Sequence, residues 1–183
     1  MIQIILIIIP VILVFIFLLL VFWLGLVLFS SFYSDFVGAP YIQNDDKVIM
    51  ESLKLAKVSS KTKLIDLGSG NGKVLRMAQK YFNVKNVLGY ELAPWPYLLS
   101  KFNKTKTIRK SLFDVDLSKC NVIYVYLLPK ILKKLTKKLA DFKKENPNAK
   151  IVSPVFEIKE LKPLKVIKCY HKGFKKDVSI FLY

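Results

Sequence analysis

The chain has 183 residues and a formal net charge of +17, and 53% of its residues are hydrophobic. Its only two cysteines, Cys120 and Cys169, and its single histidine, His171, have no metal-ligand spacing, and one cysteine pair makes no disulfide framework. These counts exclude a zinc site and a disulfide-stapled fold, so we expect no metal and two reduced cysteines.

Residues 1–29 form an uncharged apolar segment, and the first charged side chain of the chain is Asp35. A helix needs about 20 apolar residues to cross a bilayer, and this segment is longer. A cleaved signal peptide has an apolar core of about 7–15 residues, a basic leader and small residues at the cleavage site. The apolar core here is longer, and neither the basic leader nor the small residues are found. The segment therefore predicts one retained transmembrane helix; a buried core helix is disfavoured by its charge-free length.

Residues 30–46 are interpreted as a juxtamembrane linker and residues 47–183 as one globular domain, which is an ordinary size for a domain. The charges near the membrane give no clear orientation, because Lys47 stands against Asp35, Asp45 and Asp46. We therefore infer the side of the membrane on which the domain lies from the compartment that holds its ligand.

The most informative stretch of the domain is Leu64–Lys73, which reads LIDLGSGNGK. An apolar strand that runs into a glycine-rich turn and then a helix lets the backbone pass close to a ligand. The residues expected to line a cofactor in this stretch are Asp66, Gly68, Ser69, Gly70 and Gly72.

A second acid, Glu91, ends the next apolar run, and in an α/β sheet both acids would lie at the carboxyl ends of the strands. A carboxylate at this place can accept hydrogen bonds from two ribose hydroxyls. Lys73 occupies the position of the third glycine of a dinucleotide fingerprint, so a pyrophosphate cofactor is disfavoured. The D-x-G-x-G-x-G pattern resembles motif I of the seven-β-strand methyltransferases, which implies S-adenosylmethionine (AdoMet) as cofactor.

Hydrophobic periodicity divides the domain into alternating strands and helices. Helices are expected at 47–57, 71–82, 95–102 and 130–144, and strands at 63–67, 86–91, 105–109, 120–128, 149–155, 164–170 and 177–183. This alternation predicts an α/β, Rossmann-like doubly wound sheet of seven strands, with the last strand antiparallel after a hairpin near Gly173. His171 is expected at the surface of that hairpin.

The predicted helix 130–144 is strongly basic on one side. Three interpretations of this face are possible: a solvated surface, contact with anionic lipid, or nucleic-acid binding. Nucleic acid is disfavoured, because the chain has no recognisable nucleic-acid-binding module. The lysines concerned are Lys133, Lys134, Lys137, Lys138, Lys143 and Lys144.

Four short sequence motifs follow the apolar segment in a fixed order: Gly38–Tyr41, Asp66–Lys73, Gly89–Trp95 and Val125–Pro129. This order resembles the small membrane-anchored protein-lysine methyltransferases whose mitochondrial members modify the ATP synthase c subunit and the ADP/ATP carrier. The resemblance implies transfer of a methyl group from AdoMet to a lysine of a membrane-associated protein.

The chain departs from this family at three places. Gln43-Asn44 replace a Pro-Thr pair, Ala93 replaces an asparagine, and Ser111 replaces an acid that binds the adenine amino group. Ser111 is kept as a cofactor-binding candidate that would form a weaker hydrogen bond.

Methyl transfer to an amine is an in-line displacement, in which the protein mainly positions the reactants. The residues expected to line the amine channel are Trp95, Tyr126 and Pro129, for which ordinary packing is the alternative. A lipophilic small-molecule substrate, or an inactive cofactor-binding scaffold, also remains open. AdoMet is kept in the cytosol or an organelle matrix, so the domain of this single-pass protein is expected on that side of the membrane.

Overall fold

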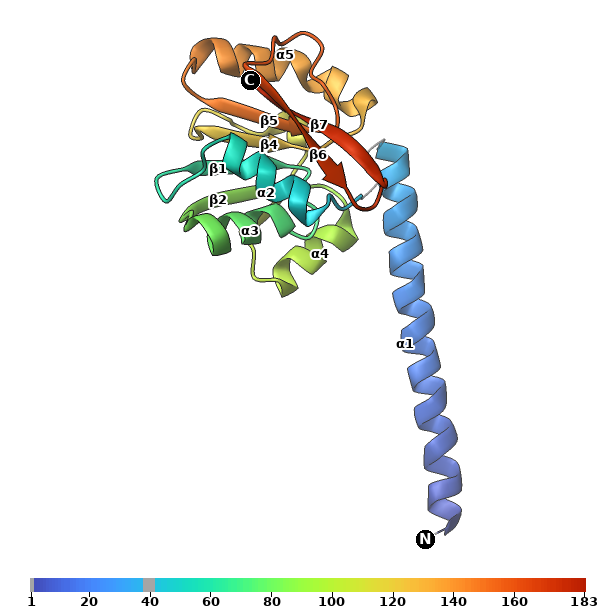
Figure 1. The fold of residues 1–183 in the computed structure, drawn as a ribbon. Coiled ribbons are helices and arrows are strands. Elements are labelled where there is room, and N and C mark those ends of the chain that lie inside the picture. Colours follow the sequence, from blue (N-terminus) through green and yellow to red (C-terminus); the bar gives the residue numbers. More distant parts are fainter. Residues whose placement is uncertain (1, 38–41) are drawn as a thin grey trace.

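The computed structural model describes residues 2–37 and 42–183, and shows one long helix that extends away from an α/β domain (Figure 1). This helix, α1, runs over Ile2–Val37. Its described segment Ile8–Phe29 has a mean hydropathy of 3.3 and no buried residue, so it is long and apolar enough to cross a membrane. The Gly38–Tyr41 motif lies outside the described residues.

The described domain is built on a seven-stranded sheet in the order β3-β2-β1-β4-β5-β7-β6. The first five strands in this order are parallel, and β7 is antiparallel to both β5 and β6. The strands are β1 (Lys63–Leu67), β2 (Asn86–Glu91), β3 (Thr107–Arg109), β4 (Val122–Val125), β5 (Lys150–Pro154), β6 (Lys165–His171) and β7 (Lys176–Leu182). The predicted doubly wound sheet with an antiparallel last strand is confirmed.

Helices cover both faces of the sheet and bury two apolar layers. On one face, α2 and α3 pack on Leu64 and Val122; on the other, α5 packs on Ile65 and Ile123. The helices are α2 (Asp46–Leu55), α3 (Lys73–Phe82), α4 (Pro94–Phe102) and α5 (Pro129–Glu145), with a short 3-10 helix η1 (Leu112–Asp114).

Several elements are shorter than predicted, and two of these differences lie at the carboxyl edge of the sheet. The first crossover helix begins at Lys73 rather than residue 71, because Gly70 and Gly72 have positive φ angles that a helix does not allow. The expected strand 120–128 ends at Val125, since the chain leaves the sheet before α5 starts at Pro129. These residues border the site described below.

The prediction that His171 lies at the surface is wrong, because only 4% of its area is exposed. The hairpin folds Phe174 onto its imidazole, with the ring centroids 4.0 Å apart. Nδ1 accepts a hydrogen bond from the Phe174 amide at 3.2 Å. Cys120 and Cys169 are free and buried, as expected.

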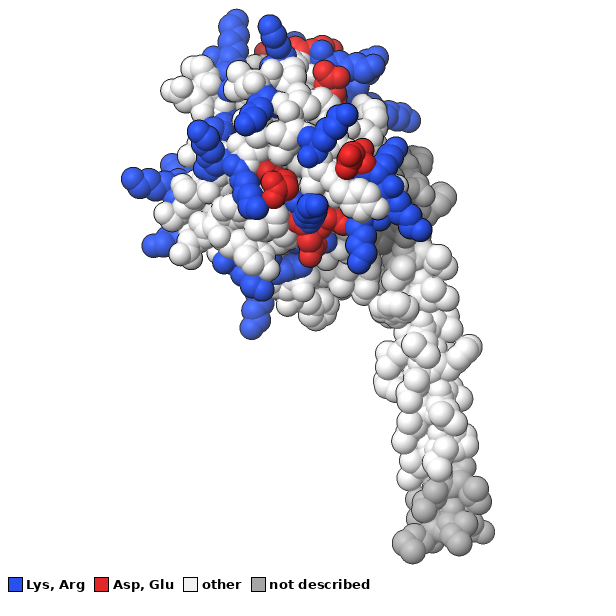
Figure 2. Space-filling view, viewed as in Figure 1, with Lys and Arg blue, Asp and Glu red and all other residues white. Residues whose placement is uncertain are grey.

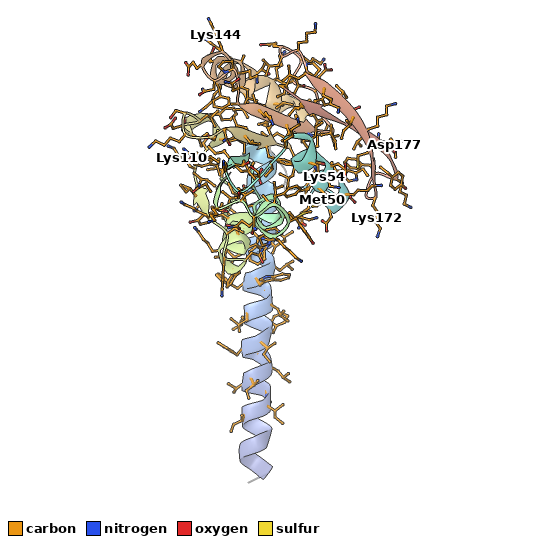
Figure 3. The ribbon with its side chains drawn as sticks, turned by 60° about the vertical axis from the view of Figure 1, so that its left-hand side comes forward. Met50, Lys54, Lys110, Lys144, Lys172 and Asp177 are labelled. Carbon is orange, nitrogen blue, oxygen red and sulfur yellow. The ribbon has the colours of Figure 1, made fainter. Side chains whose placement is uncertain are left out.

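Charge is distributed unevenly between the two parts of the molecule. Figure 2 shows Lys and Arg spread over the visible face of the domain, whereas the described surface of α1 carries none. The lysines of α5 lie at the end of the domain farthest from the free end of α1, where Lys144 is labelled in Figure 3. The apolar stripe of α5, including Leu135 and Leu139, is buried against the sheet.

Candidate active site

The glycine-rich turn after β1 is docked onto the end of β2. The amides of Gly68 and Ser69 both donate to the carbonyl of Tyr90, at 2.9 and 3.0 Å. Gly68 has a φ of 79°, and a Cβ there would lie 2.8 Å from Leu127 Cδ2. The positive φ favours glycine at this position, and the side chain of Leu127 packs against it.

Glu91 is oriented by two backbone amides at the end of β2. Its Oε2 accepts from the Gly70 amide and its Oε1 from the Ala93 amide, each at 2.8 Å. Burial raises the pKa of this carboxyl, while hydrogen bonds from Ala93, Gly70 and Leu92 oppose that rise. Each carboxylate oxygen has a further lone pair, so the fixed side chain can still accept hydrogen bonds from a ligand.

Asp66 lies inside the domain beside the turn, with 3% of its area exposed. Its register partners are Gly89 of β2 and Tyr124 of β4. Burial, and secondly the charge of Glu91, raise the pKa of Asp66 from 3.8 to about 8. Two acids close together, one of them buried, at the switch point of an α/β sheet are a typical sign of a functional site.

The chain just before α2 closes over this acid. Asn44 Nδ2 donates to the hydroxyl of Tyr124 at 2.8 Å, and both residues are buried. Burial is the first cause that raises the pKa of Tyr124, and the charge of Asp66 is the second. The segment 42–46 is thus held against the end of β4.

Lys73 of the motif also holds this segment. Its Nζ donates to the carbonyl of Asn44 at 2.9 Å and forms an ion pair with Asp46. Lys73, whose place in the motif disfavours a dinucleotide, therefore links the start of α3 to the start of α2.

These elements enclose a cavity of about 40 Å³. Ser69 lines it, and the Ser69 hydroxyl is buried without a hydrogen-bond partner in the described part of the protein. A cavity of this volume holds a water molecule rather than a nucleoside, so ligand binding must widen it. Its lining residues that matter here are Asn44, Asp66, Gly68, Ser69, Gly70, Tyr124 and Tyr126.

The predicted channel residues do not all lie together. Tyr126 lines the cavity and stacks on Phe156, with a centroid distance of 6.1 Å. Trp95 instead contacts Trp23 of α1, and Pro129 is the exposed first residue of α5. Their roles in positioning an amine remain predictions.

The remaining cofactor candidates in and after the turn, Gly72 and Ser111, do not line the cavity. Gly72 caps the start of α3 with a φ of 77°, and a Cβ there would collide with the side chain of Thr105. Ser111 is half-buried two residues after β3, where its Oγ accepts from the Phe113 amide at 3.4 Å. Ser111 is thus near the correct sheet edge, but it does not line the cavity.

Sequence reasoning missed Asn44, Tyr124 and the role of Lys73. The contact between Asn44 and Tyr124 joins residues 80 positions apart, which no local pattern predicts. One signal was present: Gln43-Asn44 departs from the Pro-Thr pair of the resembling family.

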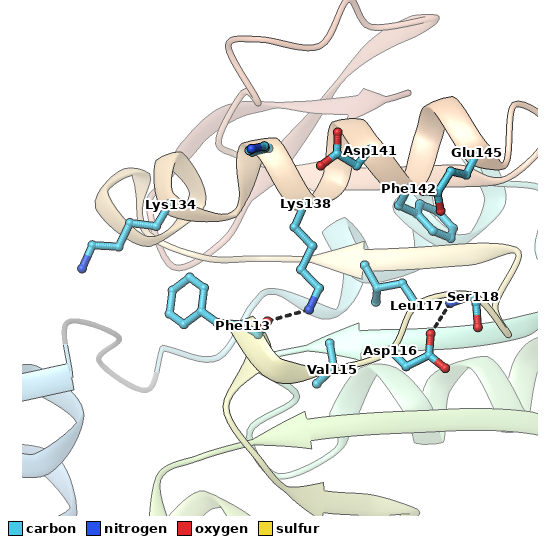
Figure 4. A pocket seen from close by; sticks show the side chains of 11 residues that line it. Phe113, Val115, Asp116, Leu117, Ser118, Lys134, Lys138, Asp141, Phe142 and Glu145 are labelled. Atoms are coloured by element: carbon cyan, nitrogen blue, oxygen red, sulfur yellow. Dashed lines mark hydrogen bonds between the residues drawn. The ribbon is translucent and has the colours of Figure 1, made fainter.

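Two larger hollows lie elsewhere on the described surface. One, of about 900 Å³, adjoins the site at Asn44 and Lys73 and reaches the β6–β7 hairpin. The other, of about 560 Å³, lies between α5 and residues 113–118, and there Lys138 Nζ donates to the Phe113 carbonyl at 2.6 Å (Figure 4). No motif residue lines the second hollow, and its lysines are interspersed with Asp116, Asp141 and Glu145.

Comparison with known proteins identifies the chemistry of this fold. Residues 66–165 match the family described as the ANTKMT methyltransferase domain. The chain belongs to this methyltransferase family. A protein-lysine N-methyltransferase of Saccharolobus islandicus (strain REY15A) is 33% identical over 151 residues, which cover 78% of this chain and 92% of that protein. The predicted enzyme class is confirmed, and with it AdoMet as cofactor.

More distant relatives agree with this assignment. The adenine nucleotide translocase lysine N-methyltransferase of Mus musculus is 29% identical over 137 residues, covering 70% of this methyltransferase but only 58% of the mouse protein. A Salinibacter ruber RNA methyltransferase, solved with S-adenosyl-L-homocysteine, is 22% identical with a TM-score of 0.66, over 78% of this chain and 92% of that chain. The last likeness shows the shared fold.

Proposed function

We propose that this methyltransferase transfers a methyl group from AdoMet to a lysine of a membrane-associated protein. It would be anchored by α1 within residues 1–29, joined through residues 30–46 to the catalytic domain at 47–183. The domain would face the cytosol, or the matrix of an organelle, where AdoMet is kept.

The observation that carries the cofactor site is the geometry of Glu91. Its two oxygens are fixed by the amides of Gly70 and Ala93 at the end of β2, directly beside the glycine turn. A ribose offers two neighbouring hydroxyl donors, and this carboxylate presents two acceptors. The buried hydroxyl of Ser69, which has no hydrogen-bond partner among the described residues, fits a ligand that lies against the turn.

Bound AdoMet supplies an electrophilic methyl group on a sulfonium. The residues of the chain have to hold the cofactor, admit a lysine amine in its neutral form and exclude water. Glu91 and the turn would hold the nucleoside, and Tyr126 would form an aromatic wall beside the incoming amine. Desolvation beside such a wall favours the neutral amine, because it lowers the pKa of a lysine.

The lysine substrate is supported by the two relatives, both of which are protein-lysine methyltransferases. Membrane anchoring is supported by the length and hydropathy of α1. A lipophilic substrate would instead need an enclosed apolar pocket; the three hollows described above are lined by charged residues.

Calorimetric titration of AdoMet into the full chain, kept in a mild detergent, tests the cofactor site. We expect saturable binding that Glu91→Gln weakens by about tenfold or more, because charge-assisted hydrogen bonds to the ribose are lost. Glu160→Gln is the matched control, since Glu160 is exposed and outside the site. Equal affinity of the two variants would overturn the assignment of Glu91 to the ribose.

A further inference from the structure

The long helix α1 contacts the domain at α4, which begins three residues after Glu91. The rings of Trp23 on α1 and Trp95 on α4 meet edge to face, with centroids 6.1 Å apart. Both views place α4 at the end of the domain from which α1 extends away (Figures 1 and 3). This contact marks Trp23 as the position along α1 at which the helix meets α4.

The free part of α1 has the length of a membrane crossing. From Ile2 to Phe22, before the contact with α4, lie about 21 residues, or roughly 32 Å at 1.5 Å per residue. The hydrocarbon core of a bilayer is about 30 Å thick. The described side chains of this part, from Ile8 onward, are all exposed, so no domain element covers them. Trp23 and Trp95 would then lie at the membrane–water interface, the depth at which tryptophan is enriched.

An exposed apolar stripe on α4 continues from this contact. Trp95, Leu98 and Phe102 recur at spacings of three and four residues and share one helix face. Leu98 is 41% exposed and Phe102 73% exposed, whereas Pro96 and Ser100 on the opposite face are buried against the domain.

Basic side chains flank the stripe. Lys101 and Lys104 are exposed at the end of α4, although Lys101 Nζ also donates to the Thr107 carbonyl at 2.6 Å, and Lys106 follows in the strand connection. An apolar stripe with lysines beside it is the pattern of a helix that lies in the headgroup region of an anionic bilayer.

We propose that α4, through Leu98 and Phe102 with Lys101 and Lys104 beside them, seats the domain on the anionic surface of the membrane that α1 crosses. The proposal rests on the membrane anchoring proposed above. It assigns lipid contact to α4 and not to the more basic α5, which lies at the opposite end of the domain in both views.

This seating limits the substrate class. Glu91 is four residues from Trp95, so the cofactor site lies within about 14 Å of the interface even along a fully extended chain. The target lysine would therefore lie in the part of a membrane protein that borders the bilayer surface.

The test uses the full chain in liposomes of phosphatidylcholine and phosphatidylglycerol, with a nitroxide label on Phe102→Cys. Leu164→Cys is the matched control, because Leu164 is also apolar and is 71% exposed. The native cysteines are buried, and burial raises the pKa of the Cys120 thiol to about 12, so labelling is directed to the introduced residue. Collision of the label with oxygen, which partitions into lipid, is compared with collision with a water-soluble nickel chelate.

We expect the Phe102→Cys label to be several-fold less accessible to nickel than the Leu164→Cys label. The double substitution Lys101→Glu and Lys104→Glu should restore nickel access, whereas the same charge change at Lys133 and Lys144 of α5 should not. If alkaline carbonate removes the protein from the liposomes, anchoring fails and the seating fails with it. If the protein resists carbonate but both labels collide equally with nickel, the seating alone is overturned.

Discussion

Asp66 is kept in this protein at a cost to stability. Its carboxyl is buried beside a second acid, and both the burial and the charge of Glu91 raise its pKa from 3.8 to about 8. A neutral polar side chain of the same shape would avoid the desolvation of a charge, which supports the proposal that this carboxyl takes part in cofactor binding.

We predict that Asp66→Asn makes the unliganded protein more stable than the natural chain, by an amount that grows as pH rises. We also expect the substitution to weaken AdoMet binding. Between about pH 4 and pH 8 the folded protein keeps a proton that the unfolded chain has released, so the stability of the natural chain falls with rising pH. The variant lacks this dependence, and its melting temperature should exceed that of the natural chain most clearly above pH 8. Thermal unfolding across this range, in the absence of cofactor, checks it; parallel pH profiles would contradict the raised pKa.

The hydrogen bond between Asn44 and Tyr124 gives a second prediction at this scale. Asn44→Ala should lower the free energy of unfolding by about 1–3 kcal/mol, because it leaves the buried Tyr124 hydroxyl without its donor. Adding Tyr124→Phe should recover part of that loss, since both partners are then removed. Urea unfolding of the two single variants and the double variant measures this coupling, and strictly additive losses would argue against the bond.

At the scale of elements, the site is formed where a local motif meets a distant segment. The glycine turn and Glu91 could be predicted from sequence, because strand, turn and following acid are set by local spacing and by the rule that ligands bind at strand ends. The closure by segment 42–46 could not, since it depends on tertiary contacts of Lys73 and Asn44. Tyr126 is predicted from its place at the end of a central strand and lines the cavity. Trp95 is predicted for the same site and contacts Trp23 of α1, so its role at the site stays a prediction.

We predict that Lys73→Met loosens segment 42–46 without unfolding the domain. Asp46 is exposed and Lys73 is half-buried, so this ion pair contributes only about 1 kcal/mol and global stability should change little. Hydrogen exchange of the backbone amides in residues 42–46 should become faster, while the amides of β1 and β4 stay protected. Lys54→Met, which removes the surface ion pair with Glu51, is the control; unchanged exchange in residues 42–46 would contradict the role of Lys73.

At the scale of the whole molecule, the sequence predicts an apolar helix, a basic domain and a methyltransferase sheet, and all three are present. Their relative placement could not be predicted. The lysine-rich α5 was a candidate for lipid contact, but it lies at the end of the domain away from the free end of α1. The less charged α4 lies beside α1 because of the contact between Trp23 and Trp95. This arrangement puts the cofactor site close to the proposed membrane surface.

The most direct test of the account is methyl transfer by the full chain in a native membrane fraction. The protein, reconstituted in liposomes, is mixed with that fraction and with AdoMet carrying a radioactive methyl group, beside the Glu91→Gln variant. The account predicts label in the lysines of a membrane protein, and about tenfold less label from Glu91→Gln when AdoMet is kept well below its dissociation constant. Label recovered in the lipid extract, or no label from a protein that binds AdoMet, would contradict it.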